Sequence, residues 1–296
     1  MSTPVSGRLT DVDFWDRQYD STADIPQAEE TGRRPRSRVR RAVRKILSPK
    51  LIALMQDYRL YLLWDVIYPR FLRHRSGARV LEVGSAPGDH LVQLHAAFGL
   101  EPYGVEYTAH GADLNRQVFQ RNGLDPAHVL HDDFFNPAFQ DRYRGSFDVV
   151  VSRGFIEHFE DLAPVIDAHV NVLAPGGTLV VTVPNLRGIN YWLTWFFQRD
   201  FLKVHNLSIM QRSAFARLFE RDDLASLYCD YFGAFNVGLS YPKPNSVKEK
   251  ILTGLRQAQP LLNALYRLAF KPGQAEHRWL SSYLIFVGRK PGSPHP

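Results

Sequence analysis

The chain has 296 residues, and 45% of them are hydrophobic, so it is long enough and apolar enough to bury the core of a large domain and is not disordered throughout. Its formal net charge is +6, and its single cysteine, Cys229, excludes an intramolecular disulfide and a cysteine-rich metal site. No signal-peptide pattern is visible, and no apolar run approaches the roughly 18 residues that span a bilayer. We therefore expect a cytoplasmic protein.

The first 74 residues are expected to form N-terminal elements ahead of the main domain. Residues 1–32 carry scattered proline, glycine and acidic residues, and they predict a loosely structured lead-in with an aromatic patch at Phe14, Trp15 and Tyr19. Residues 36–74 predict helices, because Leu, Tyr and Trp recur there at helical spacing.

The positive charge is concentrated in a basic segment, residues 33–50. This segment contains nine basic residues, and the rest of the chain carries 27 basic against 30 acidic residues. Four apolar residues fall on one stripe of a helix in this segment: Val39, Val43, Ile46 and Leu47. We expect it to contact an anionic membrane surface, with a solvated helix that packs its stripe on the domain as the alternative. Nucleic acid is the less favoured partner, because the remaining chain is slightly acidic.

From residue 79 onward, short β-branched runs alternate with helical stretches, which is typical of βαβ units around a parallel sheet. The expected strands are residues 80–83, 102–106, 127–130, 147–151, 178–183 and 283–287. The pattern predicts an α/β fold: a doubly wound, mostly parallel seven-stranded sheet with helices on both faces. This domain would cover residues 75–290, followed by a tail of residues 291–296.

Two stretches lie outside the minimal sheet, at about residues 186–222 and 240–279. The second contains a leucine-rich helical pattern that we expect to break at Pro260. Both follow the fifth strand, so we interpret them as a helical and aromatic cap over the active site. The first contains six aromatic residues that either favour an apolar or planar ligand or simply pack within the cap: Tyr191, Trp192, Trp195, Phe196, Phe197 and Phe201.

A small-residue loop, residues 84–88, follows the first strand, where ligands of open parallel sheets bind. Gly84 and Gly88 permit a tight turn, and the next helix supplies free N–H donors. Glu106 follows at the end of the second strand, where a carboxylate can accept hydrogen bonds from both ribose hydroxyls. Asp89 occupies the position of the third glycine in dinucleotide-binding loops, and its charge would repel a phosphate. The loop therefore favours a cofactor without phosphates.

From about residue 78 to residue 290, the sequence resembles the class I S-adenosylmethionine-dependent methyltransferases. Five ordered motifs carry the resemblance: Glu82 with Gly84, Ala86 and Gly88; Glu106; Asp133-Phe134; Phe147-Asp148; and residues 173–177. Ala86 replaces a glycine of the family pattern. The resemblance implies a methyltransferase of the EC 2.1.1 type with S-adenosylmethionine as its cofactor.

The same resemblance implies the cofactor contacts. Glu106 would hold the ribose, Asp133 or Asp132 the adenine amino group, and Glu82 would orient the loop or bind the ammonium. The predicted cofactor-binding residues are Glu82, Gly84, Ser85, Ala86, Gly88, Glu106, Tyr107, Asp132, Asp133, Phe134 and Ser152. The alternative is that these residues only cap helices and turns in a protein that binds no nucleoside.

Residues 152–159 resemble the segment after the fourth strand in quinone-type and other small-molecule O-methyltransferases. The Asn/Asp-Pro-Pro-Tyr motif of N-methyltransferases does not follow the fourth strand, so oxygen is the favoured acceptor atom. His158 is the candidate base, because a histidine titrates near neutral pH, and a structural histidine bonded to a loop is the alternative. His205, in the cap, is the second catalytic candidate.

Some quinone-type relatives hold a divalent cation near the pair that corresponds to Glu157 and His158. Gly154 stands at the position of their additional acid, so we predict no metal site. The acceptor is left open among small natural products, quinones, lipid-linked saccharides and fatty acids. The competing hypothesis is a catalytically silent S-adenosylmethionine-binding subunit that regulates or scaffolds a partner.

Overall fold

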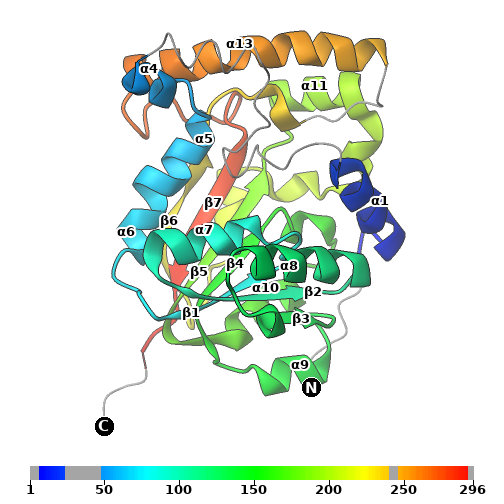
Figure 1. Cartoon of the computed structure of the whole chain (residues 1–296), viewed down its shortest axis with the longest axis vertical. Coiled ribbons are helices and arrows are strands. Elements are labelled where there is room, and N and C mark those ends of the chain that lie inside the picture. The colour runs from blue at the N-terminus through cyan, green and yellow to red at the C-terminus, as the bar shows by residue number, and fades with distance from the viewer. Residues whose placement is uncertain (1–6, 24–47, 240–245, 293–296) are drawn as a thin grey trace.

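The computed structural model describes residues 7–23, 48–239 and 246–292, and most of the basic segment lies outside these residues. Seven strands form one sheet in the order β3-β2-β1-β4-β5-β7-β6 (Figure 1). The strands are β1 Arg79–Val83, β2 Glu101–Glu106, β3 Val129–His131, β4 Phe147–Arg153, β5 Leu173–Pro184, β6 Ala225–Phe232 and β7 Tyr283–Arg289. The first five are parallel, and β7 is antiparallel to both of its neighbours, so the predicted fold class is confirmed.

The strand order reverses between β1 and β4, which pair in parallel with Leu81 opposite Val150. After β1 the chain adds β2 and β3 toward one edge of the sheet. It then returns to place β4 on the other flank of β1 and continues toward the opposite edge. In such sheets the crevice outside the carboxyl ends of the two central strands is the ligand site. The topology therefore places the ends of β1, β2 and β4 around one crevice.

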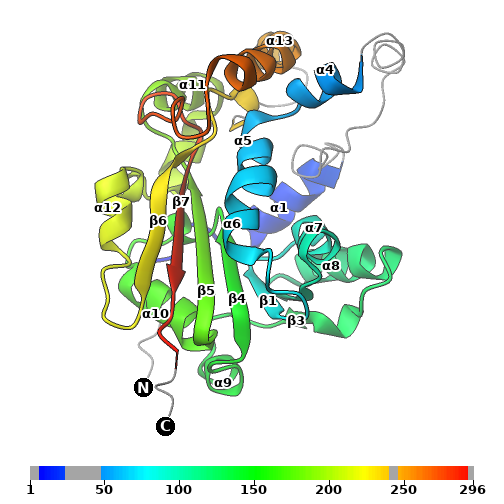
Figure 2. The ribbon, with the colours of Figure 1, turned by 90° about the vertical axis from the view of Figure 1, so that its left-hand side faces the viewer.

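Helices cover both faces of the sheet (Figure 2), because successive residues of each central strand face opposite sides. Val80 packs in one core with Leu91 of α7 and Phe119 of α8. Leu81 packs in the other core with Ile166 of α10. The first core includes residues of α7 Asp89–Phe98 and α8 Ala109–Arg121. The second includes residues of α9 Pro137–Arg142, α10 Ala163–Val172 and α12 Arg212–Arg217.

The described part of the N-terminal region is helical. Residues 12–23 form α1 Val12–Ala23, so the prediction of a loosely structured lead-in is wrong for them. Helix formation from residue 49 onward agrees with the prediction. These elements are α4 Pro49–Leu54, α5 Tyr58–Tyr61, a π-helix Leu62–Ile67 and α6 Tyr68–Leu72. Tyr58 and Tyr68 are buried against the sheet face that also carries α7.

The cap contains α11 Ile189–Gln198, directly after β5, and α13 Val247–Ala269. Figure 1 shows both helices beyond one end of the sheet. The predicted break at Pro260 is wrong, because α13 continues through it. Leu252 before the proline and Ala264 after it are both buried against the protein, which offsets the one hydrogen bond that proline removes. Within the described residues, no helix is both long and apolar enough to cross a membrane.

Candidate active site

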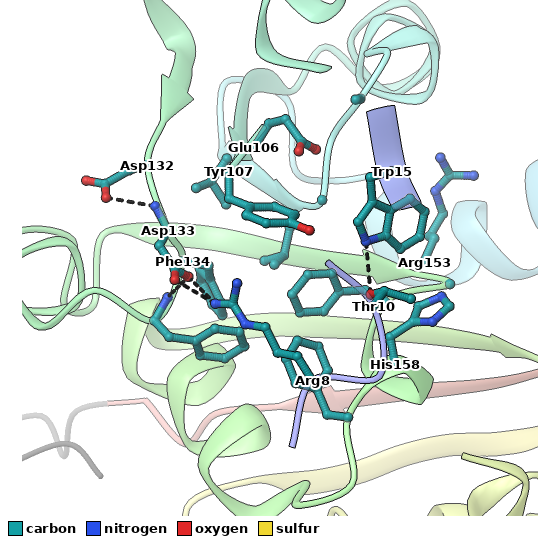
Figure 3. Close-up of a pocket in the computed structure, with 18 of the residues that line it drawn as sticks. Arg8, Thr10, Trp15, Glu106, Tyr107, Asp132, Asp133, Phe134, Arg153 and His158 are labelled. Atoms are coloured by element: carbon teal, nitrogen blue, oxygen red, sulfur yellow. Dashed lines mark hydrogen bonds and ion pairs between the residues drawn. The ribbon is translucent and has the colours of Figure 1, made fainter. Parts of the chain in front are cut away.

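A cavity of about 160 Å³ opens at the crevice (Figure 3). Three parts of the chain line it: the carboxyl ends of the first four strands, the segment after β4, and an N-terminal segment, residues 8–19. The first two were expected from the sequence, and the third was not.

Glu106, at the end of β2, is the best defined polar group of the cavity. Its carboxylate is 2% exposed and accepts hydrogen bonds from the Thr108 backbone N–H at 3.0 Å and the Tyr19 hydroxyl at 3.3 Å. Burial raises the pKa of Glu106, although these hydrogen bonds favour the ionised form. The carboxylate faces the cavity as an acceptor, which suits the hydroxyls of a ribose.

The loop after β1 is held against α8 by small residues. Gly88 has φ +104°, and a Cβ atom there would lie 2.1 Å from the Asn115 Oδ1 atom. The Asn115 side-chain amide donates to the Ser85 hydroxyl at 2.6 Å. Gly84 and Ala86 line the cavity, whereas Ser85 and Gly88 lie behind it and fix the path of the loop.

Glu82 also lies behind the cavity wall. Its Oε1 atom is 3.0 Å from the Nδ1 atom of His90 and accepts a hydrogen bond from Arg153 Nε at 2.8 Å. Burial opposes the charge of Glu82, but His90 and Arg153 outweigh it and lower the pKa of this carboxyl. Arg153 lines the cavity, so Glu82 orients an arginine at the site.

Two carboxylates follow β3 at the cavity edge. Asp132 accepts a hydrogen bond from the Asp133 backbone N–H at 2.8 Å. Asp133 accepts one from the Phe135 backbone N–H at 3.0 Å, and Phe134 beside it is buried. Tyr107 lines the wall between these acids and Glu106.

The N-terminal segment supplies residues that the sequence did not assign to the site. Arg8 donates to both oxygens of Asp133 at 2.6 Å, and its guanidinium lies 5.3 Å from the centre of the Tyr107 ring (Figure 3). Tyr19 reaches Glu106, and burial together with Glu106 raises the pKa of the Tyr19 hydroxyl. Trp15 and Tyr19, four residues apart, lie on one side of α1, and this spacing was the available signal.

His158 follows β4 and lines the cavity under Trp15, whose ring meets it edge-on with ring centres 5.0 Å apart. Its Nδ1 atom lies 2.7 Å from the Val204 carbonyl oxygen. The carbonyl can only accept, so Nδ1 carries the proton and Nε2 keeps its lone pair. Burial lowers the pKa of His158 to about 4, so the ring is neutral at neutral pH.

His205 lies behind His158, with ring centres 4.5 Å apart, and is not among the described residues that line the cavity. Its Nδ1 atom lies 2.7 Å from the Phe201 carbonyl oxygen. Burial and the neighbouring His158 lower the pKa of His205 to about 3. The second catalytic candidate thus contacts the first rather than the cavity.

Glu157 completes a buried group with these two histidines. Each of the three offers one ligand atom, and these atoms lie within 4.8 Å of one another. Burial raises the pKa of Glu157 to about 8. A carboxylate and two imidazoles suit a divalent cation of the zinc, iron or manganese type. We predicted no metal site because Gly154 stands where some relatives carry an additional acid. That prediction did not consider His205, which lies beside Glu157 and His158, so it requires a test.

The predicted cofactor residues therefore divide into two sets. Those that line the cavity are Gly84, Ala86, Glu106, Tyr107, Asp132, Asp133 and Phe134. Glu82, Ser85, Gly88 and Ser152 lie behind it, and the hydroxyl of Ser152 is buried without a hydrogen-bond partner among the described residues. The described cap residues are absent from the lining, which corrects our interpretation of the cap as the cover of the site. The N-terminal segment has that position instead.

The strand order, the loop after β1 and the carboxylates after β2 and β3 define an S-adenosylmethionine-dependent methyltransferase. The sequence matches the family model for the methyltransferase domain over residues 55–228, and the chain belongs to this family.

The chain is similar to curated methyltransferases in sequence and to several solved structures in fold. The chain is 27% identical over 183 residues to the ubiquinone biosynthesis O-methyltransferase of Psychrobacter cryohalolentis, covering 56% of this chain and 70% of that protein. Geranyl diphosphate C-methyltransferase from Streptomyces coelicolor superposes with a TM-score of 0.51 at 16% identity, covering 81% of this chain and 82% of that chain. The [4+2]-cyclase SpnF superposes with a TM-score of 0.50 at 14% identity, covering 99% and 100%. These structural likenesses show the fold alone.

Proposed function

We propose that this methyltransferase transfers a methyl group to an oxygen atom of a small acceptor that binds beside His158. The observation that carries the proposal is the state of His158: a neutral imidazole on the cavity wall whose Nε2 atom has no hydrogen-bond partner among the described residues. The name of the relative in Psychrobacter, an O-methyltransferase, supports the choice of oxygen.

The residues of the cavity fit S-adenosylmethionine. Glu106 would bind the ribose hydroxyls, and Asp132 or Asp133 the adenine amino group beside Phe134. Gly84 and Ala86 would lie along the methionine portion, since the backbone there approaches the cavity without a large side chain. When bound, the cofactor supplies an electrophilic methyl group on its sulfonium.

The protein would contribute a base, His158, and a hydrogen bond that orients its ring. The hydrogen bond from His158 Nδ1 to the Val204 carbonyl fixes the ring and leaves Nε2 to accept a proton. In the proposed step the acceptor hydroxyl would give its proton to His158 Nε2 as its oxygen takes the methyl group, and the bond from the methyl carbon to the sulfonium sulfur would break to leave S-adenosylhomocysteine. The Val204 carbonyl then stabilises the charged ring, because it accepts from the opposite nitrogen.

The walls around His158 indicate the kind of acceptor. Trp15, Phe155 and Phe159 line the cavity beside it, so an apolar or planar molecule is favoured over a sugar or a peptide. A quinone-like phenol or the apolar end of a lipid-linked acceptor would satisfy this wall.

The test is to incubate the protein with methyl-labelled S-adenosylmethionine and a fractionated cell extract, and then to identify the labelled product by mass spectrometry. We expect one class of small phenol or lipid-soluble hydroxyl compound with the label on oxygen. A product labelled on nitrogen or carbon would contradict the proposal. Cofactor binding without label transfer to any fraction would favour the catalytically silent subunit.

A further inference from the structure

The long helix α13 carries its apolar residues on the side that faces solvent. Positions 247, 251, 254, 258, 261, 265 and 268 recur at intervals of three and four, and none of them is polar. All of these positions are exposed, with Leu261 at 68% and Leu268 at 71%. This spacing places them on one stripe along the whole helix.

The opposite side of α13 packs on the protein with a more polar set of residues. Asn263 is buried there, and Gln259 donates from its side-chain amide to the Phe235 carbonyl at 3.0 Å. Arg267 lies over the Tyr61 ring, 3.9 Å from its centre. A surface helix normally turns its apolar stripe inward, so α13 has the reverse orientation.

A second helix extends the exposed apolar area. On α11, Trp192 is 65% exposed, and Ile189, Trp195 and Phe196 lie on the same exposed side. Lys248 of α13 lies over the Phe196 ring, 4.9 Å from its centre, and Trp279 binds the start of α11 through a backbone hydrogen bond of 3.0 Å to Ile189. Figures 1 and 2 both show the two helices side by side. We call the exposed sides of α11 and α13, with Trp279, the α11–α13 surface.

This surface concentrates the apolar exposure of the described protein. Sixteen large hydrophobic residues are exposed among the described residues, and all but Val12, Leu51 and Leu227 lie on α11, on α13 or in residues 270–280. Many exposed large apolar residues on two neighbouring helices mark an interaction site rather than ordinary surface.

The charge around the surface indicates an anionic partner. Residues 187–203 contain three basic residues and one acidic residue, and residues 246–280 contain six basic and two acidic residues. These two stretches together carry +6. A second copy of the chain would bring like charges together, whereas an anionic surface would neutralise them.

The described end of the basic segment, residues 48–50, lies beside α13. Its last residue, Lys50, belongs to α4, and Arg267 of α13 donates to the carbonyl of Ala53 in that helix. The chain therefore enters the described structure from its most basic stretch directly beside α13.

We propose that the α11–α13 surface docks on an anionic lipid bilayer, with α13 lying in the plane of the headgroups. A basic helix with one apolar side and tryptophans beside it is the pattern of an interfacial helix. The lysines flanking the stripe, such as Lys248 and Lys250, would reach the headgroups while the leucines enter the acyl boundary. This inference goes beyond methyl transfer and uses none of the residues of the active site.

The test is cosedimentation of the full chain with vesicles of phosphatidylcholine alone or mixed equally with phosphatidylglycerol. We expect binding to the mixed vesicles at low salt and weaker binding at high salt. Leu261→Glu/Leu265→Glu should lower the vesicle partition coefficient at least about tenfold, because it places two charges at the centre of the apolar stripe. Both leucines are exposed, so the variant should fold.

The matched control is Gln117→Glu/Gln120→Glu, which changes the charge equally on exposed positions of α8. It should bind vesicles nearly as wild type does, and both variants should bind S-adenosylmethionine with unchanged affinity. Equal partition of the two variants would overturn the proposal. So would dissociation of a dimer by the leucine variant, seen by light scattering without lipid, since the surface would then be a contact between copies. Failure of the methyl-transfer assay would leave this result unaffected.

A second readout uses the five tryptophans of the chain. Brominated lipids should quench the emission of Trp192, Trp195 and Trp279. The variant Trp192→Phe/Trp195→Phe/Trp279→Phe keeps Trp15 and Trp64, and its emission should be nearly unquenched. Equal quenching in the two proteins would place another part of the molecule at the bilayer.

Discussion

The cavity and the α11–α13 surface differ in which side chains they expose. At the cavity, charged groups have specific partners, as Asp133 has Arg8 and Glu106 has Tyr19. On the α11–α13 surface, large apolar groups are exposed, whereas Gln259 and Asn263 of α13 pack against the protein. The strand ends that line the cavity and α11 lie within residues 55–228, which match the family model, whereas the N-terminal segment and α13 lie outside that match. The two regions therefore support two separate hypotheses, methyl transfer in the cavity and bilayer docking on the α11–α13 surface, and each can fail without the other.

The sharpest test of the cavity is His158→Ala. It should lower kcat by about a hundredfold or more, because it removes the proposed base, while the affinity for S-adenosylmethionine stays nearly unchanged. Steady-state kinetics and calorimetry measure the two quantities. His205→Ala is the control, since His205 lies behind the wall and should lower kcat much less. If the two variants have equal kcat values, His158 has a structural role.

The next effect in size concerns Glu106, the acceptor at the end of β2. Glu106→Ala should weaken binding of S-adenosylmethionine and S-adenosylhomocysteine equally, by roughly thirtyfold, because both share the ribose and each hydrogen bond to a charged group is worth about 1.5–3 kcal/mol. Titration calorimetry measures this change. Glu101→Gln, at the other end of β2, should leave both affinities unchanged. A loss confined to one ligand would mean that Glu106 does not hold the ribose.

A buried histidine behind the cavity predicts a pH effect on stability. Burial lowers the pKa of His169 to about 4, and the unfolded value is about 6.5. Between these values the unfolded chain binds the extra proton, so the free energy of unfolding falls as the pH drops below about 6.5. From pH 7 to pH 5, wild type should lose about 2 kcal/mol more than His169→Gln, which does not titrate. Urea unfolding at both pH values measures this, and parallel losses would contradict it.

A smaller effect is expected from the N-terminal segment. The Tyr19 hydroxyl occupies an oxygen of Glu106 that the ribose would need. Tyr19→Phe removes this competitor and keeps the ring, so cofactor affinity should rise about threefold, in line with one hydrogen bond of roughly 0.5–1.5 kcal/mol. Trp15→Phe is the control, because Trp15 bonds to Thr10 rather than to Glu106. Lower affinity of Tyr19→Phe would show that the hydroxyl helps to hold the cofactor.

The smallest expected effect is that of a chelator. Gly154 stands where relatives that hold a divalent cation carry an additional acid. We therefore expect EDTA to change the activity by less than about twofold. Loss of activity that a divalent cation restores would overturn this prediction. His205→Ala would then show whether Glu157, His158 and His205 are the ligands, because it should weaken the restoring effect of the cation.

The sequence predicted those parts of the site whose signal is local. Glu106 ends β2 and Asp133 lies two residues after β3, so strand patterns and family spacing pointed to them. Arg8 contacts Asp133 across 125 residues, and no periodicity links two such positions. Strand β6 was not located, because its residues are mixed polar and aromatic rather than β-branched. The helix across Pro260 was mispredicted because proline acts locally and the packing that outweighs it does not.

The position of the N-terminal segment fixes an order of events during synthesis. Arg8 and Tyr19 leave the ribosome early, but their partners Asp133 and Glu106 follow 125 and 87 residues later. At about 5–20 residues per second, Arg8 waits roughly 6–25 seconds before its partner has been made. Strands β4 to β7 are made later still, so the partners of Arg8 and Tyr19 exist before the sheet is complete. Arg8 of the N-terminal segment must therefore stay unpaired with the cavity for more than a hundred residues of synthesis.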